Sequence, residues 1–239
     1  MILSRRVILR LGGAAGVVSM MDNHVFADAP IPAKDAVDHL LLGASDLDQG
    51  IAWVEALTGV RASVGGRHPG RGTRNALLSF GRRQYLEIIA PDPTQTHLVE
   101  QYAPLKELKA PRLFTWAAAT KDMSAVVQRA RTAGYQIGGP SDGSRTRPDG
   151  RTLKWKTMNI GNDIGALIPF FIEWGADTVH PSEDSPSGCS LESFYMEHPD
   201  PSRVGEMLAK LGIEAQVSRG PEPRLIAVIR APKGRIQLT

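Results

Sequence analysis

The chain has 239 residues, of which 42% are hydrophobic and 22% are charged, and its formal net charge is +3. These values are typical of a soluble globular protein, and so small a charge argues against a nucleic-acid partner. Cys189 is the only cysteine, which excludes an internal disulfide and a thiolate metal cluster.

Residues 1–29 have the pattern of a removable signal peptide. Arg5 and Arg6 precede a short apolar stretch rich in small residues, and Ala27 and Ala29 stand at the two positions that a signal peptidase reads. The paired arginines resemble a twin-arginine export signal. We therefore predict cleavage after Ala29, a periplasmic location and no membrane anchor after cleavage, because the apolar stretch is too short for a span. The alternative is an N-terminal helix of the fold.

The rest of the chain repeats one kind of unit three times, and such repetition determines the fold. In the first unit, residues 36–93, Ile51, Val54 and Leu57 are spaced as on one face of a helix. The predicted elements of this unit are a strand (37–42), a helix that begins after Asp46 and ends at Gly59, an irregular glycine-rich loop (65–73) and two strands (75–80 and 84–90).

The second unit, residues 111–176, and a shorter third unit, residues 190–239, follow the same order. In the second we predict a strand (113–119), a helix from Asp122 to Gly134, a glycine-rich loop (138–150) and two strands (151–160 and 167–174). In the third we predict a strand (191–197), a helix from about Pro201 to Gly212 and two strands (225–230 and 235–238). The helix-ending glycines occupy the same place in each unit.

The last strand of each unit carries a polar residue between two apolar ones. These triplets are Leu86-Glu87-Ile88, Ile172-Glu173-Trp174 and Ile236-Gln237-Leu238. In a strand the middle residue points to the face opposite its neighbours, so a carboxylate there can point into the cup of a curved sheet. Glu87 and Glu173 are therefore candidate site residues.

This order of elements resembles the vicinal oxygen chelate superfamily, whose members include glyoxalases, dihydroxybiphenyl dioxygenases and bleomycin-resistance proteins. Asp38-His39-Leu40 is similar to the opening of such a module, and the runs 66–75, 85–93 and 144–150 are similar to its glyoxalase-like branch. The resemblance implies an α+β fold of repeated β-α-β-β-β modules, two of them paired and the third shorter.

The resemblance also implies a divalent metal in the cup of the paired modules. Carried over by position, the ligands would be His39, Glu87 and Glu173, with the fourth position near Thr115. Threonine is a poor metal ligand, so the chain departs from the pattern there, and His68 is the remaining histidine that could contribute. Alternatively, His39 is a histidine of the protein core, and Glu87 is paired with an arginine.

The two glycine-rich loops carry polar residues that we predict to bind substrate: His68, Arg74, Asn75 and Arg147. One interpretation is a metal-dependent lyase, isomerase or related enzyme acting on a small oxygenated substrate, with Glu87 or Glu173 as catalytic base. The other is a metal-free protein of the bleomycin-resistance type that binds a small molecule. In both, the partner is a small molecule.

Overall fold

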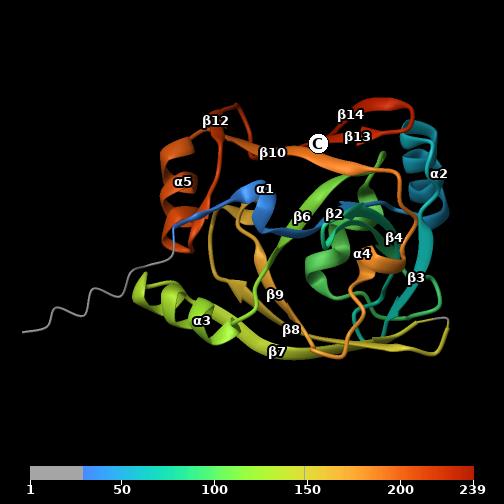
Figure 1. Ribbon diagram of the computed structural model, residues 1–239, viewed down its shortest axis with the longest axis horizontal. Helices are drawn as coiled ribbons and strands as arrows, with labels where there is room; N and C mark the ends of the chain where they lie inside the picture. The colour runs from blue at the N-terminus through green and yellow to red at the C-terminus, as the bar shows by residue number, and fades with distance from the viewer. Residues whose placement is uncertain (1–28, 148) are drawn as a thin grey trace, which may run out of the picture.

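The computed structural model describes residues 29–147 and 149–239, so the predicted signal peptide lies, apart from Ala29, outside the described residues. The described chain begins with a short strand β1 (Ile31–Pro32) and a single helical turn α1 (Ala33–Ala36), drawn in blue in Figure 1. In the described part, no helix is long and apolar enough to cross a membrane.

The first unit contains the elements that the sequence predicts, except that an additional strand forms in the predicted glycine-rich loop. Helix α2 begins after Asp46, whose side chain accepts a hydrogen bond from the Gln49 amide, and it ends at Gly59, which adopts a positive φ of 79°. The elements are β2 (Val37–Gly43), α2 (Leu47–Thr58), β3 (Ser63–His68), β4 (Thr73–Gly81), β5 (Gln84–Pro91) and a following 3-10 helix η1 (Glu100–Glu107).

The second unit repeats this order. Asp122 caps its helix by accepting a hydrogen bond from the Ala125 amide. The elements are β6 (Arg112–Ala119), α3 (Met123–Thr132), β7 (Ile137–Thr146), β8 (Thr152–Ile160), a short 3-10 helix η2 (Gly165–Leu167) and β9 (Phe170–Trp174).

The predictions of irregular loops at 65–73 and 138–150 were wrong for much of each range, because β3 and β7 occupy them. Both are edge strands that pair with β4 and β8. Glycine in β3 permits a close approach, since a Cβ at Gly65 would lie 2.5 Å from the Asn75 side-chain oxygen. Cross-strand pairing therefore outweighs the low strand propensity of glycine.

The two units form one curved sheet of eight strands in the order β3-β4-β5-β2-β6-β9-β8-β7. Its central strands β2 and β6 are antiparallel, and its edge strands β3 and β7 approach each other, so the sheet almost closes on itself. Figure 1 shows α3 outside the curve of β7, β8 and β9. The sheet thus encloses an inner space and turns its other face to the helices.

The third unit forms a separate sheet on the outer face. A short helix α4 (Pro181–Asp184) precedes this unit, whose elements are β10 (Ser190–His198), α5 (Pro201–Lys210), β11 (Ile213–Glu214), β12 (Val217–Arg219), β13 (Arg224–Ala231) and β14 (Gly234–Leu238). Four of these strands pair in the order β12-β10-β13-β14, and β11 pairs with β1. The fully buried Trp116 of β6 meets Phe194 of β10 edge-on, with 5.0 Å between ring centroids.

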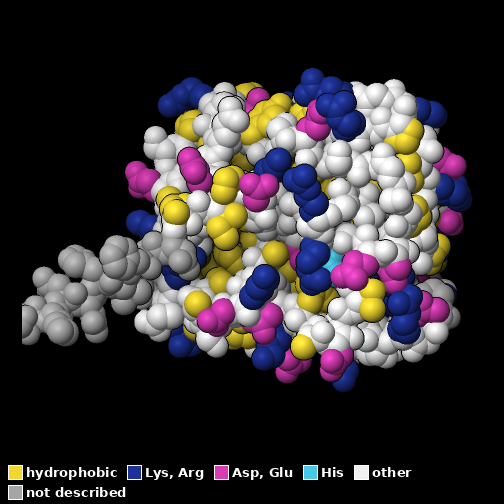
Figure 2. Space-filling view, in the orientation of Figure 1, with side chains coloured by type: hydrophobic (Ala, Val, Ile, Leu, Met, Phe, Trp, Pro, Cys, Tyr) yellow, Lys and Arg dark blue, Asp and Glu magenta, His cyan; other side chains and the backbone are white. Residues whose placement is uncertain are grey.

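The main hydrophobic core lies between the outer face of the large sheet, the helices and this smaller sheet. A smaller apolar cluster joins Leu41 and Ile89 of the inner face to Tyr102 and Leu105 of η1. The α+β fold of repeated modules, with two modules paired and a shorter third, is confirmed. Figure 2 shows basic and acidic side chains interspersed over the face that it displays.

Candidate functional site

The inner face of the curved sheet gathers polar side chains from four neighbouring strands. Alternation along each strand directs His39 of β2, His68 of β3, Asn75 of β4 and Glu87 of β5 into the enclosed space, where they line one small cavity. His39, Asn75 and Glu87 are buried. The fold therefore brings together these four residues, which the sequence predicts for the site. Their individual roles remain predictions.

Asp38 and His39 are adjacent in β2, yet their side chains meet. The register of β2 with β6 shifts between Val37 and His39, and such an irregularity turns neighbouring side chains toward the same side. His39 Nδ1 lies 2.7 Å from Asp38 Oδ1. Since a carboxylate only accepts, the Nδ1–H donates, and this leaves His39 Nε2 facing the cavity.

Asp38 accepts two further hydrogen bonds. The Trp174 indole N–H donates to Asp38 Oδ2 at 2.9 Å, and His180 Nε2 lies 3.2 Å from the same oxygen. Burial by itself raises the pKa of Asp38, but the hydrogen bonds from His180 and His39, with the charges of both, lower it to about 2. Asp38 is therefore ionised at neutral pH and fixes the orientation of the His39 ring.

Sequence reasoning gave His180 no role, but its side chain is completely buried against this network. His180 Nδ1 accepts a hydrogen bond from the Ser182 amide, so its Nε2 carries the proton that Asp38 accepts. The only signal in the sequence is local: His180 precedes Pro181 and Ser182 and serves as the N-cap of α4. Such a cap does not predict a contact with β2.

Glu87 is the centre of the cup. The side-chain amide of Asn75 donates a hydrogen bond to Glu87 Oε1 at 2.7 Å. His39 Nε2 lies 3.4 Å from Glu87 Oε2, and His68 Nε2 lies 3.7 Å from Glu87 Oε1. Burial raises the pKa of Glu87, but electrostatic interactions with the His39 and His68 rings, the Asn75 hydrogen bond and the charge of Arg145 together lower it below its usual value. Glu87 is therefore an ionised carboxylate in an enclosed space.

His68 is held neutral. Burial lowers its pKa to about 4, although the Glu87 charge opposes this change. Its Nδ1 lies 2.8 Å from the Thr73 hydroxyl, and its Nε2 accepts from the Asn75 amide at 3.3 Å. Both ring nitrogens of His68 thus have partners.

Arg145 is a buried cationic residue of the cup, whereas the sequence predicts Arg147. Arg145, from β7, is buried, lines the cavity and donates to Asn75 Oδ1 at 3.0 Å. Burial lowers the pKa of Arg145, and the charge of Glu87 opposes this change. The guanidinium nevertheless stays charged. A Cβ at Gly65 would lie 2.7 Å from its Nη1, so glycine in β3 makes room for it.

Arg147 and Arg74 do not line the cavity. Arg147 donates two hydrogen bonds to Asp184, at 2.7 and 2.8 Å, and so holds α4. Arg74 alternates with the inward-facing Asn75 and instead lies 3.6 Å from Asp46 at the start of α2. The contacts of both arginines are therefore with other parts of the protein surface.

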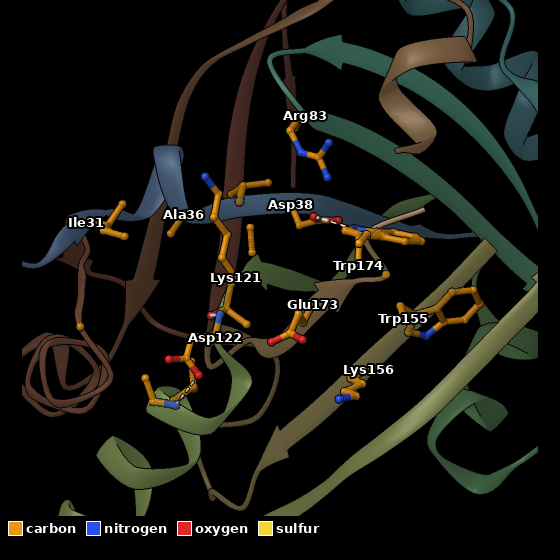
Figure 3. A pocket seen from close by; sticks show the side chains of 18 of the residues that line it. Ile31, Ala36, Asp38, Arg83, Lys121, Asp122, Trp155, Lys156, Glu173 and Trp174 are labelled. Atoms are coloured by element: carbon orange, nitrogen blue, oxygen red, sulfur yellow. Dashed lines mark hydrogen bonds between the residues drawn. The ribbon is translucent and has the colours of Figure 1, made fainter. Parts of the chain in front are cut away.

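Glu173 is not brought together with His39 and Glu87. Its carboxylate accepts a hydrogen bond of 2.6 Å from the Met123 amide, at the first turn of α3 on the outer face. In Figure 3, Glu173 extends toward Asp122, whereas the Trp174 ring lies on the other side. The phase of β9 therefore differs from that of β5, where the middle residue of the triplet faces inward.

The second module has Thr115 and Phe170 at the positions that His39 and Glu87 occupy in the first module. Asp46 and Asp122 cap the helices that follow β2 and β6, so they define equivalent points of the two modules. Counting back from these caps, Thr115 is the equivalent of His39, as the sequence predicts.

Strand pairing identifies the equivalent of Glu87. Leu41 of β2 is opposite Glu87 of β5, and the corresponding residue of β6, Ala117, is opposite Phe170 of β9. Phe170 therefore stands in the second module where Glu87 stands in the first. Its ring meets the His39 ring edge-on at 5.6 Å between centroids.

These donors do not fit a resident divalent metal. Among the described residues, no group of three or more His, Cys, Asp or Glu side chains is arranged to hold a metal ion. Metal sites in proteins normally use three or four protein ligands. His39 and Glu87 provide two, the second module offers Thr115 and Phe170, and His68 is occupied by Asn75.

The small cavity lies between two larger clefts. The central cavity has a volume of about 60 Å³. The first cleft, which we call the Trp174 cleft, has a volume of about 1250 Å³, is shown in Figure 3 and shares Trp155 and Trp174 with the cavity. The second, the Arg71 cleft, has a volume of about 1330 Å³ and shares Arg71, Tyr102, Thr157 and Phe170 with it.

Paired modules that enclose a polar cup define the fold class of the glyoxalases. A family model described as a glyoxalase-like domain matches residues 37–212. The chain therefore belongs to the glyoxalase-like domain family. No curated protein matched the chain.

Among solved structures, a hypothetical protein from Staphylococcus aureus is similar, with a TM-score of 0.62 and 16% identity over 79% of this chain and 87% of that one. The methylmalonyl-CoA epimerase of Mycobacterium tuberculosis has a TM-score of 0.45 and 20% identity over 63% and 93% of the chains. A Streptomyces coelicolor epimerase variant with 2-nitronate-propionyl-CoA has a TM-score of 0.44 and 16% identity over 59% and 98%. The first supports the fold, and the other two carry no inference about this chain.

Proposed function

We propose that this glyoxalase-like protein is an enzyme that removes a proton from a carbon beside a carbonyl group of a small oxygenated substrate, as an isomerase or a lyase does. The observation that carries the proposal is the buried, ionised Glu87 carboxylate, which lines the central cavity with His39 Nε2 3.4 Å away. A carboxylate placed in this way is suited to act as a general base.

In the proposed step, the carbon–hydrogen bond breaks and Glu87 takes the proton, while the electron pair remains on the substrate as an enolate. The Arg145 guanidinium lines the same cavity and would stabilise the negative oxygen. Return of a proton to the carbon skeleton completes an isomerisation. Loss of a group from the adjacent carbon completes an elimination.

His39 would receive the proton from Glu87. Because its pKa is lowered, Glu87 is a weak base, and transfer onward to His39 Nε2 frees it for another turnover. The Asp38 carboxylate holds the His39 Nδ1–H and stabilises the imidazolium that forms. Asp38 is a positioning residue in this scheme because it acts through His39.

A divalent metal, which the sequence analysis includes as an expectation, has no step in this proposal because the cup lacks a third protein ligand. The second candidate function is binding of a small molecule without chemistry. The observation that favours it is the Arg145–Asn75 pair, since a guanidinium and an amide hold an anion without any reaction.

The test is exchange of the proton beside the carbonyl of small 2-oxo acids, such as 2-oxobutanoate, in D₂O, followed by NMR against a protein-free blank. We expect Glu87→Gln to lower the protein-dependent rate about 100-fold or more. Glu173→Gln is the matched control, because it is the same chemical change in the last strand of the second module but outside the cup, and it should keep the rate.

Three results would contradict the proposal. An unchanged rate of proton exchange in Glu87→Gln would mean that Glu87 is not the catalytic base. Exchange lost after treatment with a chelator would favour the metal-dependent interpretation. Binding of the 2-oxo acid without exchange would favour the binding protein.

A further inference from the structure

The central cavity holds only the reacting end of a substrate. At about 60 Å³ it has room for a few atoms beside Glu87, His39 and Arg145. The remainder of any substrate must extend into one of the two adjoining clefts. The direction of entry therefore determines which residues recognise the substrate.

The end toward the Trp174 cleft is closed by aromatic side chains that are fixed in place. The Trp174 N–H donates to Asp38 Oδ2 at 2.9 Å, and the Trp174 ring meets Trp155 and His180 edge-on, with 5.5 and 5.4 Å between centroids. Figure 3 shows this Asp38–Trp174 contact at the wall of the cleft. Opening this end would break a hydrogen bond to a buried carboxylate, which is costly.

The end toward the Arg71 cleft carries an available cation. Arg71 is exposed, lines both the cleft and the central cavity, and forms no salt bridge with the described residues. The proposed base, Glu87, lines the same central cavity as Arg71. A second exposed arginine of this cleft, Arg112, is likewise without a carboxylate partner among the described residues.

The Arg71 cleft also has an apolar wall. Tyr102 and Phe114 pack with 6.2 Å between ring centroids, and Phe170 continues this wall to the cavity. The carboxylate of Glu222 lines the cleft too, but it is paired with Arg224 at 2.8 Å. The cleft therefore combines unpaired positive charge with an aromatic surface.

Resting on the proposed function, we infer that the Arg71 cleft is the substrate entrance and that the substrate is a carboxylate with an apolar or aromatic group. Arg71 binds the carboxylate, with Arg112 adding positive charge, and the apolar group lies against Tyr102, Phe114 and Phe170. A guanidinium matches a carboxylate in geometry as well as in charge.

Calorimetric titration with 3-phenyl-2-oxopropanoate, and with its neutral methyl ester, tests this inference. We expect Arg71→Met to weaken binding of the acid about tenfold or more, because a hydrogen-bonded ion pair is lost. Binding of the ester should not depend on Arg71. Lys121→Met is the matched control, since Lys121 lines the opposite cleft and forms no salt bridge with the described residues.

The outcomes separate this inference from the proposed function. If Glu87→Gln binds the acid but does not exchange its proton, both are supported. If the wild type binds the acid through Arg71 but shows no exchange, the entrance stands and the enzymatic function fails. If the acid does not bind, if Arg71→Met binds it unchanged, or if Lys121→Met weakens binding instead, the entrance inference is overturned.

Discussion

At the residue scale, the same type of side chain has different surroundings only a few positions apart. Arg145 is buried beside Asn75, whereas Arg147, two residues later, is paired with Asp184. His68 lies inside the cup, whereas His198, the last residue of β10, does not line it. What distinguishes them is burial, and burial changes the proton affinity of the group as well as its contacts.

Burial of His68 predicts a pH dependence of stability. Its pKa falls from 6.5 to about 4 on folding, so between these values the unfolded chain binds a proton that the folded chain does not. The contribution of His68 is therefore fully present above pH 6.5 and is lost as the pH falls toward 4, by roughly 3 kcal/mol in all.

Urea unfolding at a series of pH values measures this effect. The His68→Gln variant should lose that part of the decline between pH 6.5 and 4, while His198→Gln, a change at the end of β10 and outside the cup, should decline like the wild type. If His68→Gln and the wild type decline in parallel, His68 does not titrate in this way.

At the scale of secondary structure elements, the phase of a strand decides which side chains face the cup. In β5 the middle residue of the triplet, Glu87, faces inward, and its neighbours lie in the outer core. In β9 the neighbours Ile172 and Trp174 line the cavity, and Glu173 faces α3. A change of phase by one residue exchanges the two faces of a strand.

The position of Glu173 predicts a structural contribution to α3. Its carboxylate accepts the Met123 N–H at the helix N-terminus, where negative charge is also favourable. Glu173→Ala should lower the free energy of unfolding by about 1 kcal/mol, which is typical for the loss of a cap. Proton exchange should be unaffected at a temperature where the variant is folded.

Glu206→Ala, a change at an exposed position of α5, is the control and should leave stability within about 0.5 kcal/mol of the wild type. Loss of exchange in Glu173→Ala without a loss of stability would return Glu173 to the list of catalytic candidates.

At the scale of the whole molecule, the described parts of the paired modules and the third sheet share one main hydrophobic core. From the leader sequence, we propose that the protein is exported to the periplasm and cleaved after Ala29. The paired arginines of the leader are the features on which the proposed twin-arginine route depends.

Replacing both Arg5 and Arg6 with lysine should keep the precursor inside the cell, because the positive charge remains but the paired arginines are lost. Fractionation of the native host, with the N-terminus of the protein determined in each fraction, measures this. The same double change at Arg82 and Arg83, an exposed pair in the described domain, is the control and should leave export intact. Export of the leader variant, or a periplasmic protein that starts at Met1, would contradict the proposal.

The sequence by itself determined the modules. Helix caps such as Asp46 and Asp122, helix-ending glycines and apolar strands are local signals, because propensity and hydrogen bonding within a few residues produce them. Repetition of these signals then indicated the paired fold. Position within the repeat also led to His39 and Glu87, since each lies at an equivalent place in a strand.

Only the tertiary structure decided which residues complete the cup. Asp38, Arg145 and His180 come from separate parts of the chain, and no local pattern distinguishes them from other polar residues. The strand phase that turns Glu173 outward depends on pairing between β6 and β9, and the contact of His180 with β2 depends on how α4 packs. Long-range pairing and burial fix these contacts, and the order of residues along a single strand does not encode them.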